Sequence, residues 1–144
     1  MRHVVFKLAG HFFGLPIEHV REILKAPEVT PIPQSADYIE GVIFLRGHHA
    51  AVMDLRKRLG CAPFEKGQER YVIMVKLGKK VLGLIVDKVL NIFEIEENEI
   101  DDTRKVAPSF LDSKTILSIG LREGKEIFIL SLESLLEERI AKAA

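Results

Sequence analysis

The segment covering residues 70–89 most constrains how this chain can fold, because it is apolar on both faces of a predicted β-hairpin. Two apolar runs, residues 70–77 and 81–89, are joined by Gly78-Lys79-Lys80, as in a hairpin turn. Successive strand side chains point to opposite faces, and in the first run Tyr71, Ile73, Val75 and Leu77 share one face while Val72 and Met74 share the other. Each such side chain contributes about 1.5–3 kcal/mol when fully buried. A strand buried on both faces predicts two packed β units rather than one open sheet.

Shorter patterned runs predict the remaining elements. Further strands are expected over residues 4–8, 12–15, 41–45, 50–53, 116–121 and 127–130. Asp54 is expected to cap a short helix over residues 55–59 that closes at Gly60. Ser131 is expected to cap a final helix, whose apolar stripe consists of Leu132, Leu135, Leu136 and Ile140.

Residues 17–24 allow two interpretations. Pro16 at a helix start and the spacing of Ile17, Val20 and Leu24 favour a helix. The same residues also fit one helical turn followed by a short strand from Val20 to Leu24.

Composition narrows the class of protein. The 144 residues suit one domain and are 47% hydrophobic, which argues against disorder. Lys+Arg and Asp+Glu both number 21, so the formal net charge is zero and a nucleic-acid partner is not expected. The single Cys61 forms no internal disulfide, and no apolar run reaches the roughly 18 residues that span a bilayer. The sequence predicts a cytoplasmic protein that does not insert into the membrane.

Residues that could carry catalysis are few. No phosphate-binding loop, kinase signature or zinc-finger spacing is present. His48 and His49 would point to opposite faces of a strand, which disfavours a shared metal, and Cys61 has no base nearby in the sequence. We therefore predict no catalytic residue, no metal site and no cofactor.

Two charged runs are interpreted as surface. Arg56-Lys57-Arg58 is expected to form the exposed side of its short helix. The acidic residues 94–102 are expected to be a solvated face, with a docking patch as the alternative.

Several motifs occur in one order along the chain. They are Phe13-Gly14-Leu15-Pro16-Ile17 with Val20-Arg21-Glu22-Ile23, Pro31-Ile32-Pro33, Gly41-Val42-Ile43-Phe44-Leu45-Arg46-Gly47 with Asp54-Leu55-Arg56, Val81-Leu82-Gly83-Leu84-Ile85-Val86-Asp87-Lys88-Val89, and Leu130-Ser131-Leu132. In this order and over nearly the whole chain, the set resembles CheW-type coupling proteins. These are adaptors that join chemotaxis receptors to the histidine kinase CheA.

The resemblance implies an all-β fold with short helices, made of two packed five-stranded β-barrel subdomains and a C-terminal helix. It favours the strand interpretation of residues 20–24. Residues 1–144 would form a single CheW-like domain, with one subdomain from 1–65, completed by 126–144, and a second from 66–125.

The resemblance also implies a function without catalysis. The expected protein is a scaffold adaptor of a two-component signal transduction array, which binds the regulatory domain of CheA and methyl-accepting chemoreceptors. It would associate with the membrane only through these protein contacts. Alternatives are an adaptor of a paralogous array, such as one controlling type IV pilus motility, and a small-ligand-binding β-barrel.

Matching positions suggest the contact residues. The resemblance places Val20, Glu22 and Ile23 among receptor and kinase contacts, Gly41 and Arg46 at positions sensitive to loss of coupling, and Asp87 and Val89 on the kinase-facing side. An arginine can present a planar fork to a carboxylate of a partner. The alternative is that Arg46 pairs internally with Asp54 or Glu22 and only braces the fold. Under the interface interpretation, Arg46→Ala or Gly41→Asp would weaken binding without unfolding the protein.

The chain departs from the family pattern at the same place. Family members commonly have asparagine where this chain has Phe44, and apolar residues or proline around positions 48–51. A phenylalanine there removes a polar anchor and adds aromatic area, which could mark altered partners.

Overall fold

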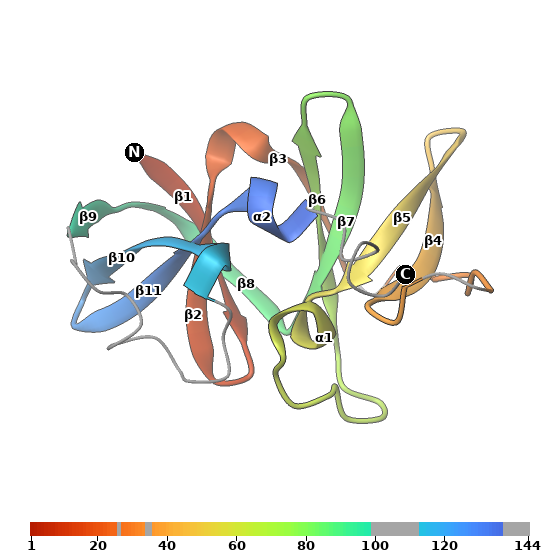
Figure 1. Cartoon of the computed structure of the whole chain (residues 1–144), viewed down its shortest axis with the longest axis horizontal. Helices are drawn as coiled ribbons and strands as arrows, with labels where there is room; N and C mark the ends of the chain where they lie inside the picture. Colours follow the sequence, from red (N-terminus) through yellow and green to blue (C-terminus); the bar gives the residue numbers. More distant parts are fainter. Residues whose placement is uncertain (26, 34–35, 99–112, 137–144) are drawn as a thin grey trace.

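The computed structural model describes residues 1–25, 27–33, 36–98 and 113–136, whose strands form two sheets lying side by side (Figure 1). The first sheet has the strand order β8-β1-β2-β11-β10-β9 and the second has the order β3-β6-β7-β5-β4. The strands of the first sheet are β1 (Arg2–Leu8), β2 (His11–Pro16), β8 (Lys88–Glu94), β9 (Glu96–Asn98), β10 (Ile116–Arg122) and β11 (Lys125–Leu130). Those of the second are β3 (Val20–Lys25), β4 (Ile39–Leu45), β5 (His48–Asp54), β6 (Tyr71–Leu77) and β7 (Lys80–Val86). The helices are η1 (Ile17–His19), α1 (Leu55–Leu59), η3 (Ser113–Thr115) and α2 (Leu132–Leu136).

The all-β class is confirmed, whereas the predicted closure into two five-stranded barrels differs from what is observed. The first sheet has six strands. Its two edge strands, β8 and β9, follow each other in sequence. Only the buried Ile95 separates them, so the chain bends there and the sheet curls. Among the described residues, no ladder of strand pairs joins the two edges of either sheet.

The boundaries between the two sheets along the sequence differ from the subdomain boundaries that we expected. Strands within residues 2–16, 88–98 and 116–130 form the first sheet, and strands within residues 20–25, 39–54 and 71–86 form the second. Strands β3, β4 and β5, which we expected in the subdomain covering 1–65, therefore belong to the same sheet as β6 and β7.

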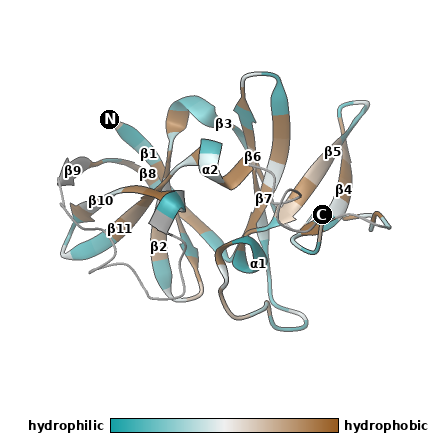
Figure 2. Ribbon diagram, in the orientation of Figure 1, coloured by the Kyte–Doolittle hydropathy of each residue, from teal (hydrophilic) through white to brown (hydrophobic). Residues whose placement is uncertain are grey.

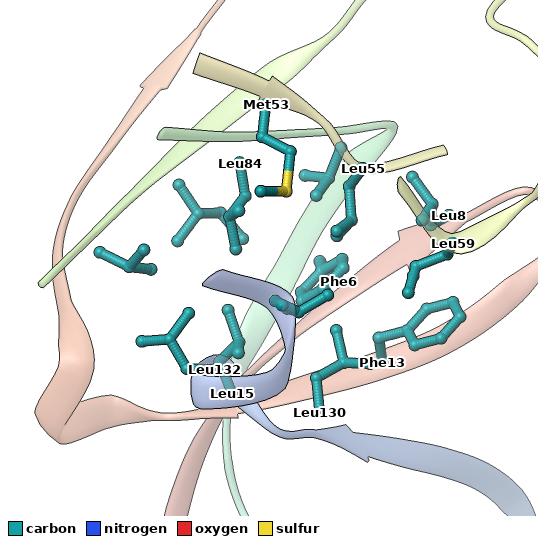
Figure 3. Packing of buried hydrophobic residues seen from close by; sticks show 14 of the residues in the cluster. Phe6, Leu8, Phe13, Leu15, Met53, Leu55, Leu59, Leu84, Leu130 and Leu132 are labelled. Carbon is teal, nitrogen blue, oxygen red and sulfur yellow. The ribbon is translucent and has the colours of Figure 1, made fainter. Parts of the chain in front are cut away.

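The hydrophobic core has three parts. One cluster fills the inside of the second sheet with Ile43, Val52, Val72, Met74 and Ile85, and another fills the inside of the first with Val5, Ile95, Ile127 and Ile129. The largest lies between the sheets, where side chains from both sheets and both α-helices meet (Figure 3). Figure 2 shows the same feature as hydrophobic colour along β6 and β7, which turns hydrophilic at the tip of their hairpin.

The hairpin that suggested two packed units is confirmed over β6. Ile73 and Val75 belong to the core between the sheets, while Val72 and Met74 face the inside of the second sheet. The prediction of one continuous strand over residues 81–89 is wrong. β7 ends at Val86 and pairs within the second sheet, whereas β8 begins at Lys88 and pairs with β1 of the first.

The ambiguous segment after Pro16 is one 3-10 turn followed by a strand, as the family resemblance implied. η1 covers Ile17–His19, and β3 pairs antiparallel with β6. The pairing shifts between Val20 and Glu22, so these two residues no longer share a face. Val20 packs on the core between the sheets, whereas Leu24 packs inside the second sheet.

Helix α1 begins and ends as predicted. The Asp54 side chain accepts a hydrogen bond from the backbone N–H of Lys57 at 3.1 Å, and Gly60 closes the helix with a left-handed φ of 81°. Helix α2 begins after Ser131, whose hydroxyl accepts from the N–H of Ser134 at 3.2 Å. The expected stripe residue Ile140 lies outside the described residues, as do residues 99–102 of the acidic stretch 94–102.

The exposed basic face predicted for α1 is wrong for two of its three residues. Arg56 is 9% exposed and Arg58 is 4% exposed, while Lys57 alone is exposed. Arg58 donates hydrogen bonds to the carbonyl oxygens of Leu135 and Ser134, at 3.2 and 2.7 Å, and lies over the Tyr38 ring. The acceptors come from distant parts of the chain, which is why the local charge run did not reveal them.

Candidate functional site

The conformation of Arg46 follows from its place in the turn between β4 and β5. Leu45 pairs with His48, which leaves Arg46 and Gly47 as the two turn residues. Their φ angles are 51° and 80°, the left-handed values of a type I′ turn, whose twist matches that of the flanking strands. The arginine therefore stands at the tip of the hairpin rather than at the end of a strand.

The guanidinium of Arg46 makes a two-pronged ion pair with Glu22. The Nη1–Oε1 distance is 2.9 Å and the Nη2–Oε2 distance is 3.3 Å. Since β3 and the β4–β5 hairpin lie at opposite edges of the second sheet, the pair spans between these edges. Internal pairing with Glu22, one of the two alternatives for Arg46, is thus observed. An exposed pair of this kind stabilises a fold by only about 0–1 kcal/mol. Because the Arg46 side chain is 77% exposed, it remains accessible to a carboxylate of a partner.

The predicted contact residues of β3 lie on both of its faces. Glu22 is half-buried beside Arg46, Ile23 is exposed, and Val20 is half-buried against the core between the sheets. The structure thus brings Glu22 and Arg46 together on one face of β3. Val20 and Ile23 lie on the opposite face, since their partners Val75 and Ile73 share a face of β6.

Gly41 is buried, and its position leaves no space for a side chain. A Cβ atom built on Gly41 would lie 2.1 Å from the carbonyl oxygen of Thr30 and 3.0 Å from the Cα of Pro31. This close approach allows Thr30 and Val42 to exchange two backbone hydrogen bonds of 2.8 Å. The structure therefore gives Gly41 a role inside the fold and does not place it on a surface that a partner can touch.

Asp87 and Val89, the residues expected on the kinase-facing side, lie where the chain passes from the second sheet to the first. The Asp87 side chain is 15% exposed and accepts two hydrogen bonds from Arg56. The hydrogen bond to Asp87 raises the pKa of Arg56 further above its ordinary value. Val89 is half-buried against the core between the sheets. Both residues are thus engaged by their own chain.

Phe44 forms an aromatic feature that the list of expected contact residues omitted. Its side chain is 67% exposed, and its ring meets the ring of His49 edge-on at 5.1 Å between centroids. Phe44 and His49 are directly paired across the hairpin. The strand alternation around the buried Ile43 was the signal that could have placed Phe44 on the outside.

The polar hollow beside α1 holds charged groups that already pair with each other. It has a volume of about 480 Å³ and includes Glu40, Asp54 and Arg70 in its lining. Arg70 donates to both carboxylate oxygens of Glu40 at 2.6 and 2.8 Å. Burial raises the pKa of Asp54, whose carboxylate caps α1. Within the described ranges, no three His, Cys, Asp or Glu side chains gather as they would around a metal ion.

Cys61 is a weak nucleophile in the folded state, because burial raises the pKa of its thiol to about 11 from an ordinary 9.0. We expect alkylation by iodoacetamide at pH 8 to be about a hundredfold slower than in the same protein unfolded in urea, since only the thiolate reacts. The unfolded thiol ionises at lower pH than the folded one, so the stability that this group contributes is lost as the pH rises from 9 towards 11. Equal alkylation rates in the folded and unfolded protein would contradict this expectation.

These features define a class of protein. Two curled sheets share a core. One tight hairpin carries the exposed Phe44 ring and the exposed Arg46, which pairs with Glu22 of β3, and this arrangement is suited to binding another protein. The chain belongs to the CheW-like domain family, whose model matches residues 2–139.

The similarity to individual relatives extends over most of both chains. The chain is similar to the chemotaxis protein CheW of Thermotoga maritima, with 28% identity over 137 residues, which cover 95% of this chain and 88% of that protein. It is 31% identical over 143 residues to the chemotaxis protein CheW of Rhizobium meliloti, covering 98% and 90% of the two chains. The crystal structure of the scaffolding protein TtCheW from Thermoanaerobacter tengcongensis matches with a TM-score of 0.81 and 33% identity, over 96% of this chain and 93% of that one. In the part of this chain that the structure describes, no helix has the length and apolar character needed to cross a membrane.

Proposed function

We propose that this protein is a non-catalytic, cytoplasmic scaffold of a chemotaxis-type signalling array. It joins the cytoplasmic tips of methyl-accepting chemoreceptors to the regulatory domain of the histidine kinase CheA. Membership of the CheW-like family supports this proposal, together with the names of the relatives, one of which is a scaffolding protein. The proposal involves no cofactor and no nucleic acid.

The exposed Arg46–Glu22 pair carries the proposal for the kinase contact. Arg46 lies on a two-residue turn, and its pairing with Glu22 of β3 holds the exposed guanidinium in place. An arginine held in this way loses little conformational freedom when it meets a carboxylate or carbonyl of a partner. Ile23 and Phe44 add exposed apolar area on the same sheet. We assign the contact to Glu22, Ile23, Phe44 and Arg46, with Val20 as a half-buried neighbour in the same strand, whereas Gly41, Asp87 and Val89 act through the fold.

The test is a calorimetric titration against the regulatory domain of CheA from the same source. The unmodified protein should bind one-to-one, and Arg46→Ala should weaken binding about ten- to thirtyfold, the effect of losing an arginine at the centre of an interface. Lys25→Ala is the matched control. Lys25 lies in β3, the strand that carries Glu22, and makes a similarly exposed ion pair with Glu69 at 3.1 Å. Equal affinity of the Arg46→Ala variant and the unmodified protein would show that the contact lies elsewhere. If the unmodified protein does not bind, the scaffold proposal fails for this kinase, and Phe44→Asn is the first variant to examine for restored binding.

A further inference from the structure

The chain crosses between the two sheets at two places within the described ranges. One crossing is η1, the 3-10 turn between β2 and β3, and the other is the single residue Asp87 between β7 and β8. Because only one residue separates β7 from β8, the direction in which the chain leaves the second sheet depends on how Asp87 is held. Figure 1 shows this junction at the lower end of β7, close to α1.

Asp87 is held by groups from both sheets. Its carboxylate accepts from Nε of Arg56 at 2.9 Å and from Nη2 of the same residue, and Arg56 belongs to the helix that follows β5 of the second sheet. The same carboxylate accepts from the backbone N–H of Ala9, at 3.1 Å, in the turn between β1 and β2 of the first sheet. The backbone N–H of Asp87 donates to the carbonyl oxygen of Lys7 in β1 at 3.2 Å.

Arg56 is fixed from its other side. Its Nη1 donates to the carbonyl oxygens of Ala62 and Pro63, at 3.0 and 3.3 Å, and its guanidinium lies over the ring of Phe64 at 4.7 Å from the centroid. The side chains of Arg56 and Asp87 are only 11% and 15% exposed. A buried ion pair is weak evidence of net stability, whereas removing one partner leaves the other charge buried and unpaired. It is also the kind of pair for which Lys cannot replace Arg, since the two-pronged geometry would be lost.

We propose that the Arg56–Asp87 pair is a joint that fixes the orientation of the two sheets, and that Asp87 is a positioning residue for the scaffold rather than a contact with the kinase. This inference rests on the proposed function. Both sheets carry exposed apolar side chains, Phe44 and Ile23 on the second and Leu117 and Leu121 on the first. A scaffold that holds two partners through different sheets needs those sheets at a set angle. Loss of the joint should therefore spare each single contact and weaken the assembly of all three proteins.

The structural test measures the distance between spin labels on the two sheets. Labels at Lys76→Cys in β6 and Glu126→Cys in β11, both exposed positions, are placed in a Cys61→Ser background. We expect a narrow distance distribution without further change, and a broadened or shifted one for Asp87→Asn. Arg56→Lys, which keeps the charge but loses the fork, should act in the same direction and serves if Asp87→Asn does not fold. Glu40→Gln is the matched control, since Glu40 and Arg70 form an equally two-pronged pair flanking the second sheet alone.

The functional test uses the CheA regulatory domain and a chemoreceptor cytoplasmic fragment, singly and together. Affinity of the Asp87→Asn variant for each partner should stay within about twofold of the unmodified protein, because the hydrogen-bond partners of Asp87 are Ala9, Arg56 and Lys7 and none of them is a proposed contact residue. The yield of the three-protein complex should fall about tenfold. Unchanged label distances in a folded Asp87→Asn protein would contradict the proposed joint. A tenfold loss of affinity for the CheA regulatory domain alone would mark Asp87 as a direct contact with the kinase. If the unmodified protein binds neither partner, the proposed function fails, while the label distances still decide whether the joint exists.

Discussion

Replacing Gly41 with alanine is expected to destabilise the protein by about 3–5 kcal/mol, and Gly41→Asp by at least as much. The added Cβ would meet the carbonyl oxygen and carbon of Thr30 at 2.1 and 2.7 Å, so backbone rather than a flexible side chain has to move. That movement breaks the two hydrogen bonds of 2.8 Å between Thr30 and Val42. Denaturant unfolding followed by circular dichroism measures the loss.

Gly47 provides the control for this substitution, because it lies in the same hairpin and no heavy atom is within 4 Å of its added Cβ. Its φ of 80° makes alanine strained but not overlapped, so Gly47→Ala should cost only about 1 kcal/mol. If Gly41→Ala were no more costly than Gly47→Ala, the close approach of Thr30 would not matter. The expected result also means that lost partner binding in a Gly41→Asp protein reports a damaged fold, contrary to our sequence-based expectation of a folded variant.

Features set by near neighbours in the sequence could be predicted. Asp54 and Gly60 mark the ends of α1 because a cap needs only a side-chain oxygen at one end and a left-handed residue at the other. The two apolar faces of β6 were visible for the same reason, since strand alternation has a fixed period of two. Both of these predictions concern interactions within a few residues, and both are confirmed.

Features set by distant partners could not be predicted. The run Arg56-Lys57-Arg58 has the composition of an exposed helix face, but Asp87 lies 31 residues from Arg56, and Leu135 lies 77 residues from Arg58. Asp87 lies in an apolar run in which the alternation of side chains between the two faces continues on both sides of it. The neighbouring residues therefore gave no sign that the chain passes from one sheet to the other at Asp87.

The candidate site shows the same division. The Arg46–Glu22 pair was one of two alternatives, because opposite charges suggest a pair without saying whether the turn brings them together. The family resemblance drew attention to Gly41 and Asp87, and the structure supplies physical reasons for both that involve the fold itself. A position matched by resemblance identifies a residue that matters; burial and contacts are needed to say how.

Arg58→Ala is expected to destabilise the protein by about 2–4 kcal/mol, because its loss leaves carbonyl groups of α2 without a charged donor inside the core. Arg58 is 4% exposed and donates to Leu135 and Ser134, which ties α1 to α2. Hydrogen exchange should therefore show faster exchange of the Leu135 amide, whose bond to the Ser131 carbonyl depends on a docked helix. Lys57→Ala, one residue earlier and exposed, should change the free energy of unfolding by less than about 0.5 kcal/mol. If the two variants proved equally stable, the arginine would be a surface charge, as its sequence neighbours suggested, and α2 would be held by its leucines alone.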